Sequence, residues 1–205
     1  MKKIILTLVI ILTMTLAVSQ AKATCPIGYT PYTVNFIDNG CNVFVEYCVY
    51  YDPISIEYDI LISDINIIPA CDPHDLTFWT TIIDAIMQDI INNNVIYPCE
   101  SLHDKTKIKI TKAGCYYYQN GLSPIAPGYI LSMISCDYSG LCKITYEVCI
   151  DTNTEPYSIR KTLLYIEYIK GLINCIEESP ALPPPGKTWF EPWTTGCYTQ
   201  PCAAE

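Results

Sequence analysis

The side chains best suited to catalysis near neutral pH or to metal binding are two histidines, His74 and His103. His74 lies between Asp72 and Asp75, and these three residues together would make a small set of metal ligands. However, an aspartate, a proline and a second aspartate at this spacing also mark the start of a helix, where each acid has a capping role. Neither histidine stands in a G-x-S-x-G, H-E-x-x-H or glycine-rich phosphate-binding motif. The sequence therefore predicts no catalytic residue, no metal site and no cofactor.

Carboxylates are the other chemically useful side chains, and the chain has 21 of them. Glycosidases work with two acidic residues, and no spacing in sequence identifies such a pair. No D-x-D-x-D-G loop of the calcium-binding kind occurs. A secreted carboxylate-dependent hydrolase acting on carbohydrate therefore stays open as an alternative function, with no residues assigned to it.

Three aromatic side chains near the C-terminus, Trp189, Phe190 and Trp193, form the candidate ligand-binding surface. Exposed aromatic rings on a rigid β scaffold are what sugar rings and partner proteins stack on, so an extracellular glycan or protein is the expected kind of partner. The structural interpretation, which we favour, is that Trp189 and Trp193 fold the chain end back onto a sheet.

Twelve cysteines give the strongest signal in the chain, and all of them lie after residue 24. They are Cys25, Cys41, Cys48, Cys71, Cys99, Cys115, Cys136, Cys142, Cys149, Cys175, Cys197 and Cys202. An even number of cysteines in an exported chain predicts a disulfide framework. No C-x-x-C pair occurs, which argues against a thioredoxin-type redox motif and a paired zinc knuckle.

The first 23 residues have the features of a signal peptide. Lys2 and Lys3 precede an apolar run over residues 4–18, and Ala21-Lys22-Ala23 fits the small-x-small pattern that signal peptidase cleaves. The run of 15 residues is short for a membrane span, which needs about 20. We therefore expect a soluble mature protein without a membrane span, secreted or held at the surface or in the periplasm of a bacterium.

The charge of the mature chain is strongly negative and unevenly distributed. Without the three lysines of the signal peptide, nine basic residues face 21 acids, which gives a net charge of −12. Residues 24–104 contain twelve acids and neither Lys nor Arg, whereas residues 105–205 contain nine of each sign. Because each phosphate contact needs a cation, nucleic acid and anionic membranes are excluded as expected partners of the N-terminal half.

A short strand with a cysteine at each end occurs twice, at residues 41–48 (CNVFVEYC) and 142–149 (CKITYEVC). Each copy is followed by an acid-proline pair, a Ser-Ile pair, an apolar run and a further cysteine, and the offset drifts only from 101 to 104 residues. We interpret residues 41–71 and 142–175 as a duplicated unit. Two copies are too few for a solenoid, so a two-fold repeated β core is expected.

The duplication also predicts a disulfide pattern. Cys41, Cys48 and Cys71 should be bonded in the same way as Cys142, Cys149 and Cys175. An intact strand separates Cys41 from Cys48 by over 20 Å at about 3.3 Å per residue, so these two cannot bond to each other.

One amphipathic helix is predicted from about Pro73 to Asn92. Its apolar positions repeat at three and four residues and are Leu76, Trp79, Ile83, Ile86 and Ile90. Alternating apolar residues predict strands elsewhere, including residues 32–37, 55–62 and 107–111. An Asn-Gly pair at residues 39–40 predicts a tight hairpin turn.

The apolar run over residues 157–176 is ambiguous, because Ile159, Leu163, Ile166, Ile169 and Ile173 also fit a helix. Its β-branched and aromatic residues and its place in the repeat favour a strand. From residue 179 the chain is rich in proline, and residues 179–205 are predicted to be an extended surface tail with neither strand nor helix.

Cys25-Pro26-Ile27-Gly28-Tyr29, the Gly40-Cys41 strand that ends at Tyr47-Cys48, and the Ala113-Gly114-Cys115 step followed by aromatic residues carry a resemblance to a known group. In the spacing of Cys, Gly and aromatic residues, most of the mature chain resembles uncharacterised cysteine-rich secreted proteins of Bacteroidota-type bacteria. The resemblance implies export and a disulfide scaffold, and it implies no activity.

Together these features predict a mainly β (α+β) fold: a disulfide-stabilised antiparallel sheet, built on the duplicated strand unit, with the helix packed on it. Residues 24–178 would form this domain. The predicted function is that of an exported non-enzymatic protein, either structural or adhesive or an extracellular binding module, and the carbohydrate hydrolase is the alternative.

Overall fold

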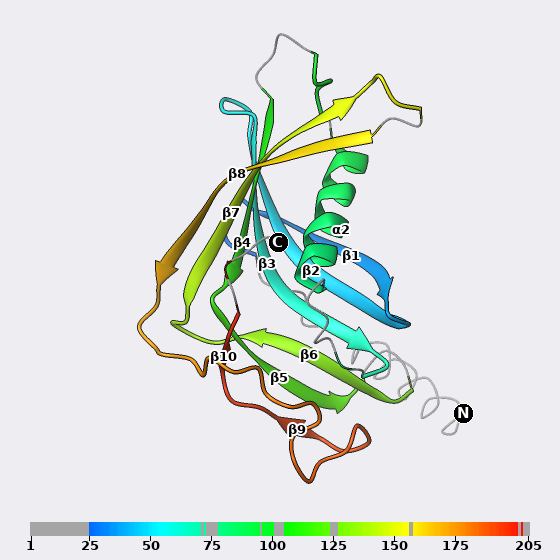
Figure 1. The fold of residues 1–205 in the computed structure, drawn as a ribbon, viewed down its shortest axis with the longest axis vertical. Coiled ribbons are helices and arrows are strands. Elements are labelled where there is room, and N and C mark those ends of the chain that lie inside the picture. Colours follow the sequence, from blue (N-terminus) through cyan, green and yellow to red (C-terminus); the bar gives the residue numbers. More distant parts are fainter. Residues whose placement is uncertain are drawn as a thin grey trace, which may run out of the picture.

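The computed structural model describes residues 25–70, 72, 78–94, 96–100, 105–123, 127–155, 158–200 and 202. Ten strands form one mixed sheet, and one α-helix within these residues packs against it (Figure 1). The mainly β fold with a single helix and a disulfide framework is thereby confirmed. The signal peptide and both histidines lie outside the described residues.

The first three strands form an antiparallel meander of β1 (Thr30–Asp38), β2 (Cys41–Asp52) and β3 (Glu57–Ile68). Asn39 and Gly40 join β1 to β2 with φ angles of 46° and 81°, the left-handed conformations that a two-residue turn of the predicted kind requires. Between β2 and β3 the register shifts after Glu46, which leaves Ser63 as the extra residue of a β-bulge.

A second antiparallel meander consists of β4 (Thr106–Ala113), β7 (Gly140–Asp151) and β8 (Ser158–Lys170). Its register also shifts, after Thr145, and leaves Leu164 as the extra residue on β8. The two meanders meet where β3 and β4 pair in parallel, from Glu57 opposite Lys107 to Leu61 opposite Thr111. The sheet is therefore mixed, because alternation within a strand does not specify the direction of its neighbour.

The sheet divides beside the bulge in β3. The N-terminal half of β3 pairs with β4, while residues Ile65 to Ile67 pair with β6 (Tyr129–Ser135). β6 in turn pairs with β5 (Cys115–Leu122), and this hairpin is inserted in the chain between β4 and β7. β3 thus holds the two branches of the sheet together.

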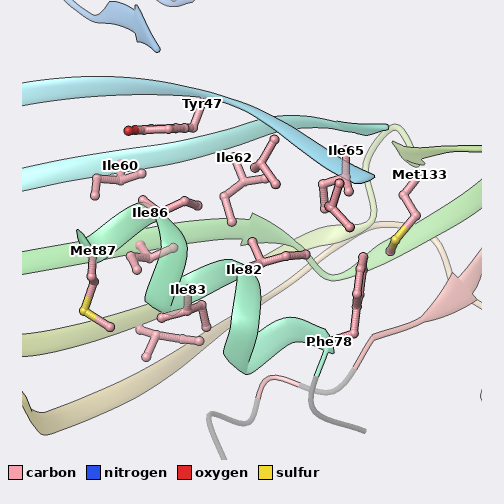
Figure 2. Packing of buried hydrophobic residues seen from close by; sticks show 14 of the residues in the cluster. Tyr47, Ile60, Ile62, Ile65, Phe78, Ile82, Ile83, Ile86, Met87 and Met133 are labelled. Carbon is pink, nitrogen blue, oxygen red and sulfur yellow. The ribbon is translucent and has the colours of Figure 1, made fainter. Parts of the chain in front are cut away.

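Helix α2 (Phe78–Asn93) covers the first meander (Figure 1). The predicted helix is confirmed over the part that is described. Its buried residues include Ile82, Ile83 and Ile86. Figure 2 shows Ile82 and Ile86 on the side of the helix that faces Ile60 and Ile62 of β3, in a cluster of residues that are almost fully buried. Near the C-terminal end of the helix, Tyr47 of β2 donates a hydrogen bond to Asp89. A polar contact therefore holds the helix on the sheet in addition to the apolar packing.

The proline-rich tail is not the surface segment that its composition predicts. β9 (Trp193–Thr194) and β10 (Tyr198–Thr199) both pair with β5, and Trp193 and Tyr198 belong to the core. The prediction of a tail without strands was wrong because pairs of two residues are too short to show alternation. Trp193 nevertheless does what the favoured interpretation says and folds the tail onto the sheet.

Five disulfides lie within the described residues: Cys25–Cys48, Cys99–Cys149, Cys115–Cys175, Cys136–Cys197 and Cys142–Cys202. Cys41 is disulfide-bonded as well, and Cys71 lies outside the described residues. Cys48 and Cys149 each bond to a cysteine that shortly precedes the strand paired with their own, while Cys142 and Cys175 bond to Cys202 and Cys115. The expectation that Cys41 and Cys48 do not bond to each other is confirmed, and the duplication itself stays a hypothesis.

Candidate functional site

Strand β8 is the most unusual surface of the described molecule. Every residue of this 13-residue strand is exposed except Ile159, which is half-buried. Its exposed apolar side chains, which we call the β8 surface, are Leu163, Leu164, Tyr165, Ile166, Tyr168 and Ile169. Single exposed apolar residues are ordinary, but a contiguous set on one strand marks a surface for association.

The position of β8 in the sheet explains its exposure. β8 pairs with β7 on one side and ends the strand order, so no described strand lies on its other side. In Figure 1 it is drawn in yellow to orange; its C-terminal half is the outermost strand of the sheet, and its N-terminal end lies near α2, where Lys161 pairs with Asp84. An edge strand presents unpaired backbone N–H and C=O groups, and β8 combines these with apolar side chains.

Both faces of β8 carry apolar groups. Leu163, Ile166 and Tyr168 stand opposite Tyr146, Ile144 and Cys142 of β7, which are buried, so they share the face of the core. Tyr165 and Ile169 stand opposite Thr145 and Leu141 and share the other face. The strand is consequently apolar above and below the sheet as well as open at its edge.

Charged residues occupy the two ends of the strand. Arg160 forms an ion pair of 2.8 Å with Asp151 of β7, and Lys161 forms one with Asp84 of α2. Glu167 and Lys170 lie near the other end of the strand. The β8 surface is therefore an apolar stretch between charges, and these charges can specify what pairs with it.

The C-terminal end of β8 is held in place by close backbone contacts. A Cβ atom on Gly171 would lie 2.2 Å from the carbonyl oxygen of Tyr138, and one on Gly140 would lie 2.5 Å from the carbonyl oxygen of Ile169. Only glycine permits the backbones to approach this closely. The disulfides Cys115–Cys175 and Cys142–Cys202 cross-link the chain near this end of β8. The exposed strand therefore extends from a part of the molecule that is covalently fixed.

The three aromatic residues predicted to bind ligand do not form one exposed surface. The Trp193 indole is buried and donates a hydrogen bond of 3.0 Å from Nε1 to the carbonyl oxygen of Thr188. Trp189 packs against it with ring centroids 5.6 Å apart, and Phe190 is 84% exposed. Of the three, Phe190 alone is fully exposed and Trp189 is half-buried, and ligand binding here stays a prediction.

A buried lysine on β4 has no counterpart among the predicted sites. Lys112 is fully buried, and its Nζ lies 4.2 Å from the centroid of the Trp79 ring. Burial lowers the pKa of Lys112 to about 7. The alternation of β4 indicates this position, because Ile108 and Ile110 point to the core and Lys112 continues their series.

Two carboxylates face each other at the bulge of the β2–β3 hairpin. Glu46 on β2 is opposite Asp64 on β3, and both are half-buried. Burial, followed by the charge of Glu46, raises the pKa of Asp64. A carboxyl group with a raised pKa beside a second carboxyl group is the pairing that acid-base chemistry uses.

No group of three or more His, Cys, Asp or Glu residues in the described part of the chain is arranged to hold a metal ion. None of the helical residues described forms a stretch long and apolar enough to cross a membrane. The disulfides fit an extracellular or otherwise oxidising environment.

No protein-family model, curated protein or solved structure matches this chain. Any functional argument therefore rests on the residues themselves, and the β8 surface is the arrangement with the clearest physical meaning.

Proposed function

We propose that this chain is an exported, non-enzymatic structural or binding module, and that the β8 surface is its point of association. The observation that carries the proposal is the exposure of the strand at its edge and on both faces. Leaving such a strand uncovered invites aggregation, and proteins normally shorten, cover or charge it. The charged residues of β8 lie toward its ends and leave the stretch from Leu163 to Ile166 uncharged, so a strand of this length on a disulfide-fixed base is better accounted for by a partner that covers it.

The experiment compares two double variants of the exported protein in the cell that produces it. Leu163→Ser with Ile166→Ser alters the β8 surface, and Ile37→Ser with Leu122→Ser alters two apolar residues that are more exposed and lie elsewhere. We expect the first variant to shift from the cell surface or extracellular matrix into the medium, measured by quantitative immunoblotting of both fractions. The control variant should distribute like the wild type.

An equal distribution of all three proteins would contradict the proposal. Circular dichroism of the purified variants would first establish that each is folded. Because the substituted residues are all exposed, we expect each change in the free energy of unfolding to stay within roughly 1 kcal/mol.

A carboxylate-dependent hydrolase acting on carbohydrate is the second candidate, and the Glu46–Asp64 pair favours it. The raised pKa of Asp64 suits a general acid, and Glu46 would be the second carboxylate. Release of reducing ends from a panel of polysaccharides, lost in Asp64→Asn and kept in Asp38→Asn, would support this function. Wild-type protein that releases none would leave the binding module as the working function.

A further inference from the structure

We infer that the occupant of the β8 edge is a second copy of the same strand, paired antiparallel about a two-fold axis to make one continuous sheet across two molecules. This inference rests on the proposed function and names its partner. Closed two-fold dimers are the commonest protein assemblies, and such an interface uses the same surface twice. The charges and the bulge of β8 together select a single register.

The bulge determines which residues can face each other. A two-fold axis normal to the sheet keeps every side chain on its own face, so paired residues must belong to the same face. Arg160 and Thr162 lie opposite Cys149 and Glu147 of β7, and Tyr165 and Glu167 lie opposite Thr145 and Lys143. These β7 residues alternate along one face, so the four β8 residues also share one.

With the axis between Leu163 and Leu164, that rule is met by every pair outside the central one, in which Leu163 lies opposite the bulged Leu164 of the second copy. Arg160 then lies opposite Glu167 of the second copy, and symmetry forms the same pair again on the other side of the axis. Thr162 lies opposite Tyr165 of the second copy on the same face. On the core face Ile159 lies opposite Tyr168 of the second copy, and the apolar residues meet in the centre.

Neighbouring registers lose this complementarity. A shift of two residues in one direction places Arg160 opposite Ile169 and Glu167 opposite Thr162. A shift in the other direction places Arg160 opposite Tyr165 and Glu167 opposite Ser158. Opposite charges on directly facing residues stabilise a strand pair, so the register with both ion pairs is preferred.

β1, which pairs only with β2 among the described strands, is a second edge of the sheet and a weaker candidate for the same role. Pro31 lies in β1 and has no backbone N–H to donate, which is a common way of blunting an edge. No proline occurs in β8. A parallel pairing of β8 with β1 of the next molecule would imitate the internal β3–β4 junction and would grow without limit, so it is an outcome that the test must separate.

Analytical ultracentrifugation of the oxidised protein tests the inference. Wild type should be in equilibrium between monomer and dimer, with no larger species. Arg160→Glu places two like charges opposite each other twice and should raise the dissociation constant about tenfold or more. Glu167→Arg should act in the same way, and Arg160→Glu combined with Glu167→Arg should restore the dimer because the pairs are reversed.

Lys161→Glu is the matched control. It changes the net charge as Arg160→Glu does and also removes an ion pair within the chain, but in the inferred register residue 161 faces Ile166 of the second copy. Its dissociation constant should stay close to that of wild type.

Three results would overturn the inference: a wild type that stays monomeric at several hundred micromolar, a double variant that does not recover, or species that grow with concentration beyond the dimer. The first of these, together with release of the Leu163→Ser, Ile166→Ser variant from the cell surface, would keep the binding function and assign β8 to a different protein partner. A monomeric wild type without that release would remove both.

Discussion

The β2–β3 and β7–β8 hairpins have nearly the same construction and opposite surroundings. Their strands are 12 and 12 residues long in one and 12 and 13 in the other, and each second strand carries a bulge. Each turn begins with an aspartate whose Oδ1 accepts a backbone hydrogen bond two residues later, Asp52 from Ile54 and Asp151 from Asn153. Local structure is therefore not what separates the two hairpins.

The two hairpins differ in how far other elements cover their second strands. β3 has β2 on one side and β4 and β6 on the other, and α2 lies over its face, so its residues alternate between buried and half-buried. β8 has one neighbour among the described strands, and nearly all of its residues are exposed. The comparison teaches that one hairpin design can supply a core strand or an interaction surface, depending only on what the rest of the chain places beside it.

The disulfides that fasten the two hairpins give the largest expected effect. Replacing Cys25 and Cys48 by serine opens a loop with a sequence separation of 23 residues, and replacing Cys99 and Cys149 opens one of 50. From the loop entropy of the unfolded chain, we expect losses of about 3 and about 4 kcal/mol in the free energy of unfolding. Urea denaturation followed by circular dichroism measures both, with the remaining disulfides verified by mass spectrometry. A larger loss for the shorter loop would show that native packing, and not chain entropy, distinguishes the hairpins.

Truncating one isoleucine in each hairpin tests the difference in cover directly. Ile60 of β3 is fully buried and Ile166 of β8 is 39% exposed. Ile60→Ala should cost about 3 kcal/mol through lost burial and a residual cavity, whereas Ile166→Ala should cost less than about 1 kcal/mol. Both are measured by urea denaturation at submicromolar protein, where a dimer would be dissociated. Equal losses would mean that β8 is covered within the monomer, and the comparison would fail.

The buried lysine on β4, the strand between the two hairpins, gives the next effect. The pKa of Lys112 is about 7 in the folded protein and near 10.5 in the unfolded chain, so between these values the unfolded state binds more protons. Stability should therefore rise with pH from about 7 towards 10, after a constant cost below pH 7.

Lys112→Met should remove that rise and make the protein more stable by roughly 2 kcal/mol at pH 6, with the gain shrinking as the pH increases. Thermal unfolding at a series of pH values below 10 measures it, since ionisation of buried tyrosines dominates above. Burial raises the pKa of Tyr118 to about 12, so stability should fall again above pH 10. A wild-type profile that is flat from pH 6 to 9 would contradict the assignment to Lys112.

Sequence patterns were sufficient to predict the helix and most of the strands, and insufficient to predict which strands pair with each other. The alternation of Tyr58, Ile60 and Ile62 predicts a strand with one buried face, and that face is buried. The β-branched and aromatic residues of β8 predict a strand against a competing helical spacing, and the strand is confirmed. Neither pattern indicates that β3 meets β4 in parallel or that β8 is left uncovered, because both depend on contacts between residues far apart in the chain.

The candidate site was missed for the same reason. The apolar residues of β8 predict a strand without indicating its neighbours, and only the strand order shows them at an edge. Lys112 could be found from the sequence, since it continues the inward series of Ile108 and Ile110. The Glu46–Asp64 pair could not, because the bulge at Ser63 sets which residue of β3 stands opposite Glu46.

The disulfide connectivity has a consequence for how the chain acquires its bonds in an oxidising environment. Three disulfides join cysteines that are separated by 60, 61 and 60 residues: Cys115–Cys175, Cys136–Cys197 and Cys142–Cys202. As the chain emerges from its N-terminus, Cys115 meets Cys136 and Cys142 before any correct partner is available. Oxidation in order of appearance would therefore trap wrong bonds, and the protein needs either thiols that stay reduced until Cys175, Cys197 and Cys202 have emerged or an isomerase that corrects the early bonds.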